Sequence, residues 1–156
     1  GERMKLEPLY ELRLKYESGS WLNPYGDKEW AGFGQGVGTV KGPRIQGTMR
    51  WSNHPRRRED GRWCPDMDGV IQTEDGAEIL LGLKGYSIKE QTPTVRRAIV
   101  AAVWLQASDE RCRWLNYVLG IGEGEIDEVT EELWIRVSFC RNEVAQAPHA
   151  IGALPP

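Results

Sequence analysis

The fold is decided by the stretch from Gly42 to Gly85, which reads GPRIQGTMRWSNHPRRREDGRWCPDMDGVIQTEDGAEILLGLKG. Short runs of β-forming residues alternate there with glycine, proline and aspartate, which is typical of strands joined by tight turns. The expected strands are Arg44–Asn53, Asp66–Thr73 and Ala77–Tyr86. Asp75-Gly76 separates the last two, and an Asp-Gly turn commonly joins antiparallel strands.

The same pattern continues on both sides of this stretch. Apolar and polar residues alternate with a period of two in residues 6–16, which indicates a half-buried strand. The segment 98–107 is apolar on both faces, and its β-branched content favours a strand over a short helix. Residues 114–121 and 132–140 are predicted to be the last two long strands. Residues 18–38, rich in glycine and aromatic residues, are expected to form a long loop that leads into a strand and could cover one barrel end.

These segments add up to about eight strands with short turns and no helix. An antiparallel sheet of that size removes its exposed edges by closing into a barrel or folding into a sandwich. A closed eight-stranded barrel has room for its own side chains or for one small ligand. We therefore expect a single all-β domain over residues 1–156, an antiparallel β-barrel with its core in residues 6–140 and an extended tail in 141–156.

Composition argues against several function classes. The net charge of -3 lacks the basic footprint of a nucleic-acid-binding protein, and the run Arg56–Arg58 is followed at once by Glu59 and Asp60. No apolar stretch of this sequence is long enough to cross a membrane, and we expect no secretory signal peptide in it, although the start at Gly1 leaves room for a removed segment. We therefore expect neither nucleic acid nor membrane as a partner.

Cysteine and histidine usage bears on compartment and metals. Three widely spaced cysteines, Cys64, Cys112 and Cys140, make a disulfide framework improbable and fit a cytoplasmic setting. With two histidines and no CxxC or HxxxH pattern, no dedicated zinc site is expected. The alternating glycines 32–38 are not a phosphate-binding loop, because no Lys-Ser/Thr follows them.

Acidic and basic residues in the central stretch suggest a polar pocket. Asp66 and Asp68 are two residues apart and share one face of their strand, and the same parity places Arg44 and Arg50 on one face of the strand before. A carboxyl group inside an apolar barrel would have a raised pKa suited to proton transfer, and an arginine could hold a developing oxyanion. We predict Asp66 as acid or base and Arg50 as its partner. The alternative places both arginines on the outer face, because Met49 and Trp51 form the apolar set.

Aromatic and amide side chains complete the predicted pocket. Seven tryptophans are many for this length, and their apolar faces with one polar atom suit an aromatic or polycyclic ligand, although core packing accounts for part of them. We predict that Trp51, Trp63 and Tyr86 wall the substrate. Asn116 could contact a ligand carbonyl, or it could make a structural hydrogen bond to the adjacent strand.

Several short segments resemble a known family in their order and spacing. They are Gly42–Gly47, Pro65-Asp66, Thr73–Ala77 and Trp114–Asn116. In them the chain resembles the family catalogued as domain of unknown function number 3237, over about residues 6–140. The resemblance implies a small β-barrel similar to lipocalin-like and allene-oxide-cyclase-like barrels, often assembled as a homo-oligomer. It implies no settled activity.

Our sequence-based hypothesis is a cofactor-independent acid/base enzyme, an isomerase or cyclase of secondary metabolism. It would act on a small, aromatic or polycyclic organic metabolite inside the barrel, with Asp66 and Arg50 catalytic and with Arg44 and Asp68 among the residues that bind substrate. Such chemistry needs neither metal nor nucleotide. The alternatives are a non-catalytic carrier or sensor that uses the same pocket, and an oligomeric structural module filled by its own side chains. Fold alone cannot choose among them.

Overall fold

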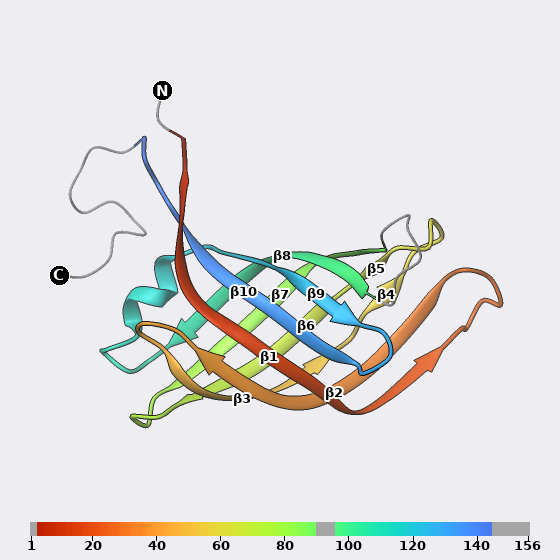
Figure 1. Ribbon diagram of the computed structural model, residues 1–156, viewed down its shortest axis with the longest axis horizontal. Helices are drawn as coiled ribbons and strands as arrows, with labels where there is room; N and C mark the ends of the chain where they lie inside the picture. Colours follow the sequence, from red (N-terminus) through yellow and green to blue (C-terminus); the bar gives the residue numbers. More distant parts are fainter. Residues whose placement is uncertain (1–2, 90–95, 145–156) are drawn as a thin grey trace.

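The computed structural model describes residues 3–89 and 96–144, which form an all-β protein with one short 3-10 helix (Figure 1). Its elements are β1 (Lys5–Leu22), β2 (Trp30–Lys41), β3 (Gln46–Asn53), β4 (Arg56–Arg57), β5 (Trp63–Cys64), β6 (Asp66–Thr73), β7 (Glu78–Lys89), β8 (Arg96–Ala107), η1 (Arg113–Tyr117), β9 (Gly120–Asp127) and β10 (Glu132–Arg141). Residues 90–95 and most of the predicted tail, from residue 145 onward, lie outside the described residues.

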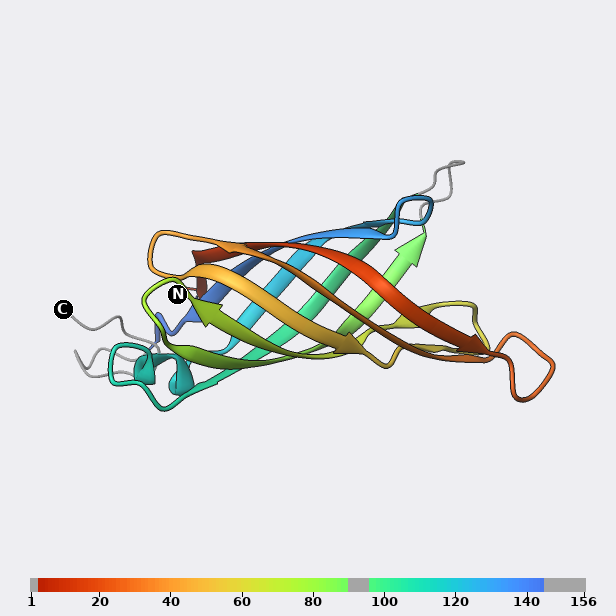
Figure 2. The same ribbon diagram turned by 90° about the horizontal axis from the view of Figure 1, so that it is seen from below.

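Eight long strands close into an antiparallel ring. Their order is β1, β2, β3, β6, β7, β8, β9, β10 and back to β1, and every neighbouring pair is antiparallel. Seen from below, these strands run obliquely around a common axis (Figure 2). The short strands β4 and β5 form a hairpin on the rim, between β2 and β7. The predicted all-β barrel of about eight strands is confirmed.

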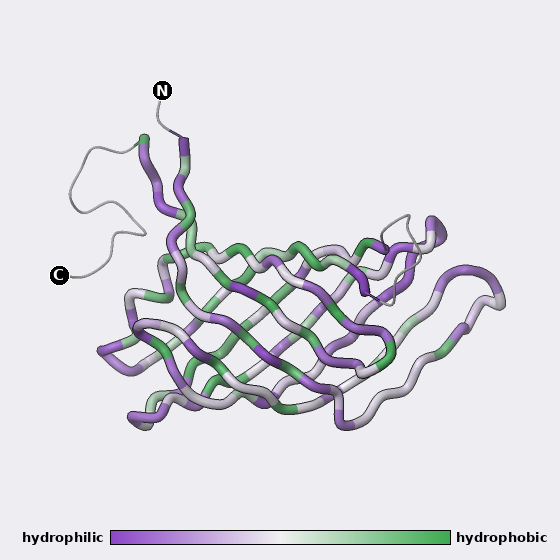
Figure 3. Tube along the Cα trace, in the orientation of Figure 1, coloured by the Kyte–Doolittle hydropathy of each residue, from purple (hydrophilic) through white to green (hydrophobic). Residues whose placement is uncertain are grey.

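Every second residue of each long strand points into the barrel, and these side chains fill its interior. Hydrophobic and hydrophilic residues alternate along the tube in Figure 3, as a sheet with one buried face requires. The largest fully buried side chains come from strands all around the ring and include Leu12, Leu14, Met49, Met67, Ile71, Ile79, Leu83 and Ile135. This alternation fixes strand register, because a one-residue slip would expose the whole apolar set.

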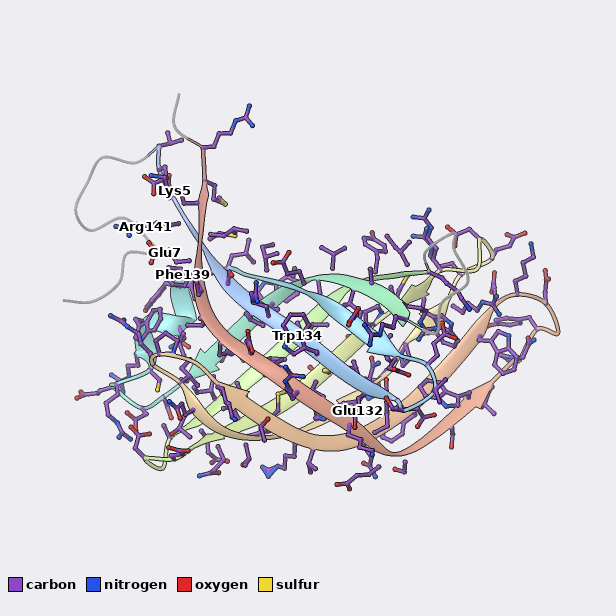
Figure 4. The ribbon with its side chains drawn as sticks, viewed as in Figure 1. Lys5, Glu7, Glu132, Trp134, Phe139 and Arg141 are labelled. Carbon is purple, nitrogen blue, oxygen red and sulfur yellow. The ribbon has the colours of Figure 1, made fainter. Side chains whose placement is uncertain are left out.

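One barrel end is closed by the segment between β8 and β9. The Leu115 side chain of η1 is fully buried, and the Trp114 ring meets Phe139 edge-on at 5.9 Å between ring centroids. The start of β1 and the end of β10 continue past this end as a pair, with the Arg141 guanidinium 2.6 Å from the Glu7 carboxylate (Figure 4). Ligand access is therefore more open at the opposite end.

Two sequence-based expectations about secondary structure are wrong. Residues 18–38 are not a long loop: β1 runs to Leu22, β2 starts at Trp30, and only residues 23–29 connect them. The glycines that suggested a loop permit close approach within the sheet, since a Cβ at Gly36 would lie 2.0 Å from the Lys15 carbonyl oxygen. Residues 114–121 are not one strand either, because η1 occupies the segment up to Tyr117 and β9 begins at Gly120.

Ring closure predicts that the free energy of unfolding depends strongly on the buried residues of β10. Ile135 is fully buried between β1 and β9. Ile135→Ala should lower the free energy of unfolding in urea by about 2–5 kcal/mol, through lost burial and the cavity left behind. Val129→Ala, at a turn position that is 73% exposed, should change it by less than about 0.5 kcal/mol. Equal effects of the two substitutions would contradict this account of the core.

Candidate functional site

A cavity of about 250 Å³ opens at the barrel end opposite η1. The ends of β1, β3 and β7, the start of β8 and the β9–β10 turn surround it, and the rim hairpin β4–β5 covers one side. It is lined by Tyr16, Trp21, Asn53, Pro55, Trp63, Pro65, Ser87, Arg97, Ile99, Ile126, Glu128, Glu131 and Leu133. Most of this lining is apolar, with a few polar groups among it, as is usual for a small-molecule site.

Aromatic rings form one wall of the cavity. Tyr16 contacts Trp51 edge-on at 4.8 Å between ring centroids, and Trp21 contacts both Tyr16 and Trp63 edge-on at 5.9 Å. The glycines of β2 make room for these rings, because a Cβ at Gly34 would lie 2.3 Å from the Tyr16 ring. The glycine-rich strand and the aromatic wall are therefore parts of one packing arrangement.

The hydroxyl group of Tyr16 is held by a buried amide. The Asn53 Oδ1 atom accepts the Asp66 backbone N–H at 3.0 Å, which fixes the amide orientation, and Nδ2 then donates to the Tyr16 hydroxyl oxygen at 2.7 Å. Within the described residues no acceptor takes the Tyr16 proton. Burial raises the pKa of Tyr16, while the Asn53 hydrogen bond and the Arg97 charge act in the opposite direction. Tyr16 is thus a neutral hydrogen-bond donor to the cavity at neutral pH.

Arg97 brings a desolvated cation to the same cavity. Its side chain is 21% exposed, its guanidinium lies 5.8 Å from the Trp63 ring centroid, and burial lowers its pKa. An arginine nevertheless stays charged in proteins. The Glu128 carboxylate is 3.9 Å from Nε, beyond hydrogen-bond distance, so Nε is buried without a hydrogen-bond partner among the described residues. The Ser87 hydroxyl is likewise buried without a hydrogen-bond partner among the described residues. Buried polar groups normally have a hydrogen-bond partner, so these two atoms are exceptions at this end of the barrel.

Glu131, on the rim, has a left-handed backbone. Its φ is 61°, and it is the one non-glycine residue with positive φ in the described part of the chain. It ends the β9–β10 turn, in which the Asp127 side chain accepts the N–H groups of Val129 and Thr130 and the Asp127 carbonyl accepts that of Glu131. Glycine is the usual residue in this conformation. A carboxylate on a strained backbone beside a cavity is a candidate functional group.

The structure places four of the predicted site residues on the outer face of the barrel. Arg50 lies beside Glu78, with 3.9 Å between guanidinium and carboxylate, and Asp68 is exposed on the neighbouring strand. Asp66 lies opposite Lys84 rather than Arg50, and Tyr86 is 49% exposed with Arg58 stacked over its ring. The prediction that Asp66 and Arg50 point into the barrel is wrong, because Met49, Trp51 and Met67 occupy the inner positions. A catalytic role for Asp66 or Arg50 stays a prediction, without support from the cavity geometry.

The other predicted site residues lie in the cavity wall, behind it, or at the closed end of the barrel. Trp63 lines the cavity, and Trp51 is buried behind Tyr16 with its Nε1 donating to the Val37 carbonyl at 3.1 Å. Arg44 is exposed at the closed end, where it stacks on Trp114. Asn116 makes two hydrogen bonds to the Ala107 backbone, which is the structural alternative considered from the sequence.

Sequence reasoning missed Tyr16, Asn53, Arg97 and Glu131. One signal was present: Arg97 has the same strand parity as the buried Ile99, Ala101 and Val103, and a cation at an inward position is a sign of function. The cysteine thiols at positions 64, 112 and 140 are all free. In residues 3–89 and 96–144, no three His, Cys, Asp or Glu side chains gather closely enough to hold a metal ion. The helical content of the same residues includes nothing long and apolar enough to span a membrane.

The fold and the cavity define a small antiparallel β-barrel with an internal site at one end. The chain belongs to the family described as "Protein of unknown function (DUF3237)", whose model matches residues 4–139. A search of curated proteins gives no match.

Solved structures share this fold. A β-barrel-like protein from Acinetobacter baumannii is 18% identical with a TM-score of 0.79, covering 90% of this chain and 98% of its own. A protein of unknown function from Clostridium acetobutylicum is 11% identical with a TM-score of 0.78, covering 89% and 100%. An enzyme from Penicillium herquei is 24% identical with a TM-score of 0.70, covering 90% and 99%. At these identities the likeness establishes the fold alone.

The strained turn predicts a gain in stability from removing a cavity-lining side chain. Glu131→Gly should raise the free energy of unfolding by about 1 kcal/mol, because glycine adopts positive φ without the clash that an L side chain meets. Urea denaturation measures the change. Glu131→Ala is the matched control, since it removes the carboxylate but keeps the Cβ and should not stabilise. A glycine variant less stable than the alanine variant would contradict strain at this position.

Proposed function

We propose that this protein is an acid/base enzyme, an isomerase or cyclase, acting on a small aromatic or polycyclic molecule bound in the open-end cavity. One observation carries the proposal. The Tyr16 hydroxyl, oriented by Asn53, and the charged guanidinium of Arg97 are two hydrogen-bond donor groups on residues that line one largely apolar cavity. Two donors, one of them charged, suit an oxygen atom on which negative charge develops.

In the proposed chemistry, a substrate carbonyl oxygen accepts hydrogen bonds from Tyr16 and Arg97. The Glu131 carboxylate takes a proton from the carbon next to that carbonyl, and the electron pair of the broken C–H bond moves onto the oxygen as an enolate. The proton then returns to a different atom, or the oxyanion adds to one carbon of a conjugated C=C bond of the same molecule, and the electron pair of that broken π bond takes the proton back from Glu131. Glu131 is the preferred base because it lines the cavity and its charge acts on Tyr16.

The cavity surroundings support an aromatic substrate. Trp21 and Trp63 offer flat apolar surfaces that stack on rings at low entropic cost. The solved neighbour from Penicillium herquei is an enzyme, so a barrel of this shape is compatible with catalysis. A non-catalytic carrier or sensor is the second candidate, and it is favoured by the predominantly apolar lining, which binds a ligand without requiring any reaction.

We also propose a cytoplasmic setting. The three free cysteines support it, because a reducing compartment keeps unpaired thiols intact. Burial raises the pKa of Cys112 and Cys140, so both are inert thiols rather than thiolates at neutral pH.

Binding of an aromatic anion tests the cavity. We expect 2-naphthoate to bind the native protein in calorimetric titration, and Arg97→Gln to weaken binding by roughly 10-fold to 100-fold, the usual effect of losing a charge-assisted hydrogen bond. Arg50→Gln on the outer face is the matched control and should leave the affinity unchanged. If Arg50→Gln weakened binding and Arg97→Gln did not, the site would lie on the outer face. If the native protein did not bind 2-naphthoate at all, the cavity would no longer be a candidate site.

Deuterium exchange separates an enzyme from a carrier. We expect the protein to accelerate exchange of the acidic C–H protons of 2-tetralone in D₂O, followed by NMR. Tyr16→Phe should reduce the acceleration by about 100-fold to 10,000-fold while binding persists. Exchange should also fall as pH rises through the pKa of Tyr16, above the ordinary tyrosine value of about 10, because the hydroxyl then ceases to be a donor. Asp66→Asn is the control and should retain activity. Binding without exchange would favour the carrier.

A further inference from the structure

Two sides of the barrel present outer faces of different character. Around β1 and β10 the outer face carries cross-strand ion pairs, Lys15 with Glu132 at 3.8 Å and Glu11 with Arg136 at 3.6 Å. Trp134 on this face has the Arg136 guanidinium over its ring. Such a face is well suited to water.

Around β7 and β8 the outer face is mostly apolar, and its central charged side chain is the exposed Lys84, between Gly82 and Tyr86. Its large side chains are about half exposed, and they are contributed by both strands: Leu80 (53%), Tyr86 (49%), Ile88 (37%), Val100 (47%) and Trp104 (48%). No ion pair joins β7 to β8 across this face among the described residues. Contiguous exposed apolar surface of this kind marks an interaction site. We call this surface the β7–β8 face.

A projection and a depression stand side by side at the centre of the β7–β8 face. Trp104 on β8 is directly opposite Gly82 on β7. Gly82 differs from most strand glycines of this chain, because a Cβ there would meet no atom within 4 Å. Packing inside the barrel therefore does not explain the glycine. Glycine weakens a strand interior and often marks a place where another group approaches closely.

We propose that a second copy of this chain covers the β7–β8 face through a two-fold interface. A two-fold axis that runs between β7 and β8, parallel to both, exchanges the positions above the two strands. It sets Trp104 of each copy over Gly82 of the other, and by the same register it sets Val100 over Tyr86. Such an isologous contact requires that one patch carry both the projecting group and the space that receives it, and this patch does.

The area of the face and the charges at its margins agree with this occupant, and the same register sets Lys84 of each copy over the small Ala102 of the other. Two half-exposed aromatic rings and three aliphatic side chains present on the order of 500 Å² of apolar surface per copy, a large part of the roughly 800 Å² that each partner buries in a standard interface. Arg58 lies over Tyr86 on one margin of the face, and Glu123 lies beside Val100 on the other. The same axis brings the basic margin of one copy to the acidic margin of the other.

The test is the mass of the native protein and of two variants, measured by light scattering after size exclusion at micromolar concentration. Native protein should have twice the 17.7 kDa chain mass. Trp104→Glu removes the projection, and Gly82→Arg fills the depression. Each should weaken dimerisation by at least about 30-fold, the effect of losing an interface hot spot. Both sites face outward, so circular dichroism should show folded proteins.

Val129→Glu is the matched control, because Val129 is 73% exposed on a turn away from the β7–β8 face, and this variant should stay dimeric. Monomeric native protein would overturn the proposal, and so would native dimers that neither Trp104→Glu nor Gly82→Arg dissociates. A trimer would also overturn it, because one two-fold contact cannot join three copies. The substitutions Tyr16→Phe and Arg97→Gln lie inside the barrel and should leave the dimer intact.

Discussion

Closure of the ring by β1 is the constraint on which the structure depends. This strand of 18 residues pairs with β10 over residues 5–15 and with β2 over residues 11–22, and so joins the last strand of the chain to the second one. Its inner positions supply Leu12 and Leu14 to the core and then Tyr16 to the cavity. The same alternation that buries the apolar core therefore continues into the candidate site.

Packing at the open end depends on the unequal sizes of facing residues. Large rings on β1 and β3 lie against the glycines of β2, and each ring occupies space that a β-carbon would otherwise fill. Read along the chain, those glycines look like a flexible loop, and we predicted one for that reason. Read across the sheet, they are the positions at which only glycine fits. Local composition cannot distinguish the two cases, because the decisive neighbours are distant in sequence.

Strand alternation and turn chemistry were sufficient to predict the all-β fold and the closed ring. The site was harder, for a physical reason. Arg50 and Asp66 are conspicuous charges in the central stretch, but the apolar parity of Met49 and Trp51 places Arg50 outside. Asn53 becomes meaningful only once Tyr16, 37 residues away, is brought within 2.7 Å. Arg97 reaches the same cavity from β8 and Glu131 reaches it from the β9–β10 turn, and no local pattern links them.

The hydrogen bonds between the Asn53 and Asp66 ends of the rim hairpin make the position of Tyr16 independent of the hairpin itself. The chain leaves the barrel wall after Asn53, forms the rim hairpin β4–β5, and returns at Asp66. Two hydrogen bonds tie the ends of this excursion together, one from the Asp66 N–H to the Asn53 side chain and one from the His54 N–H to the Asp66 carbonyl. The hairpin can change in length or composition while its base, and with it the orientation of the Tyr16 hydroxyl, stays fixed. Substitutions in the hairpin can therefore reshape the cavity rim without moving the Tyr16 hydroxyl.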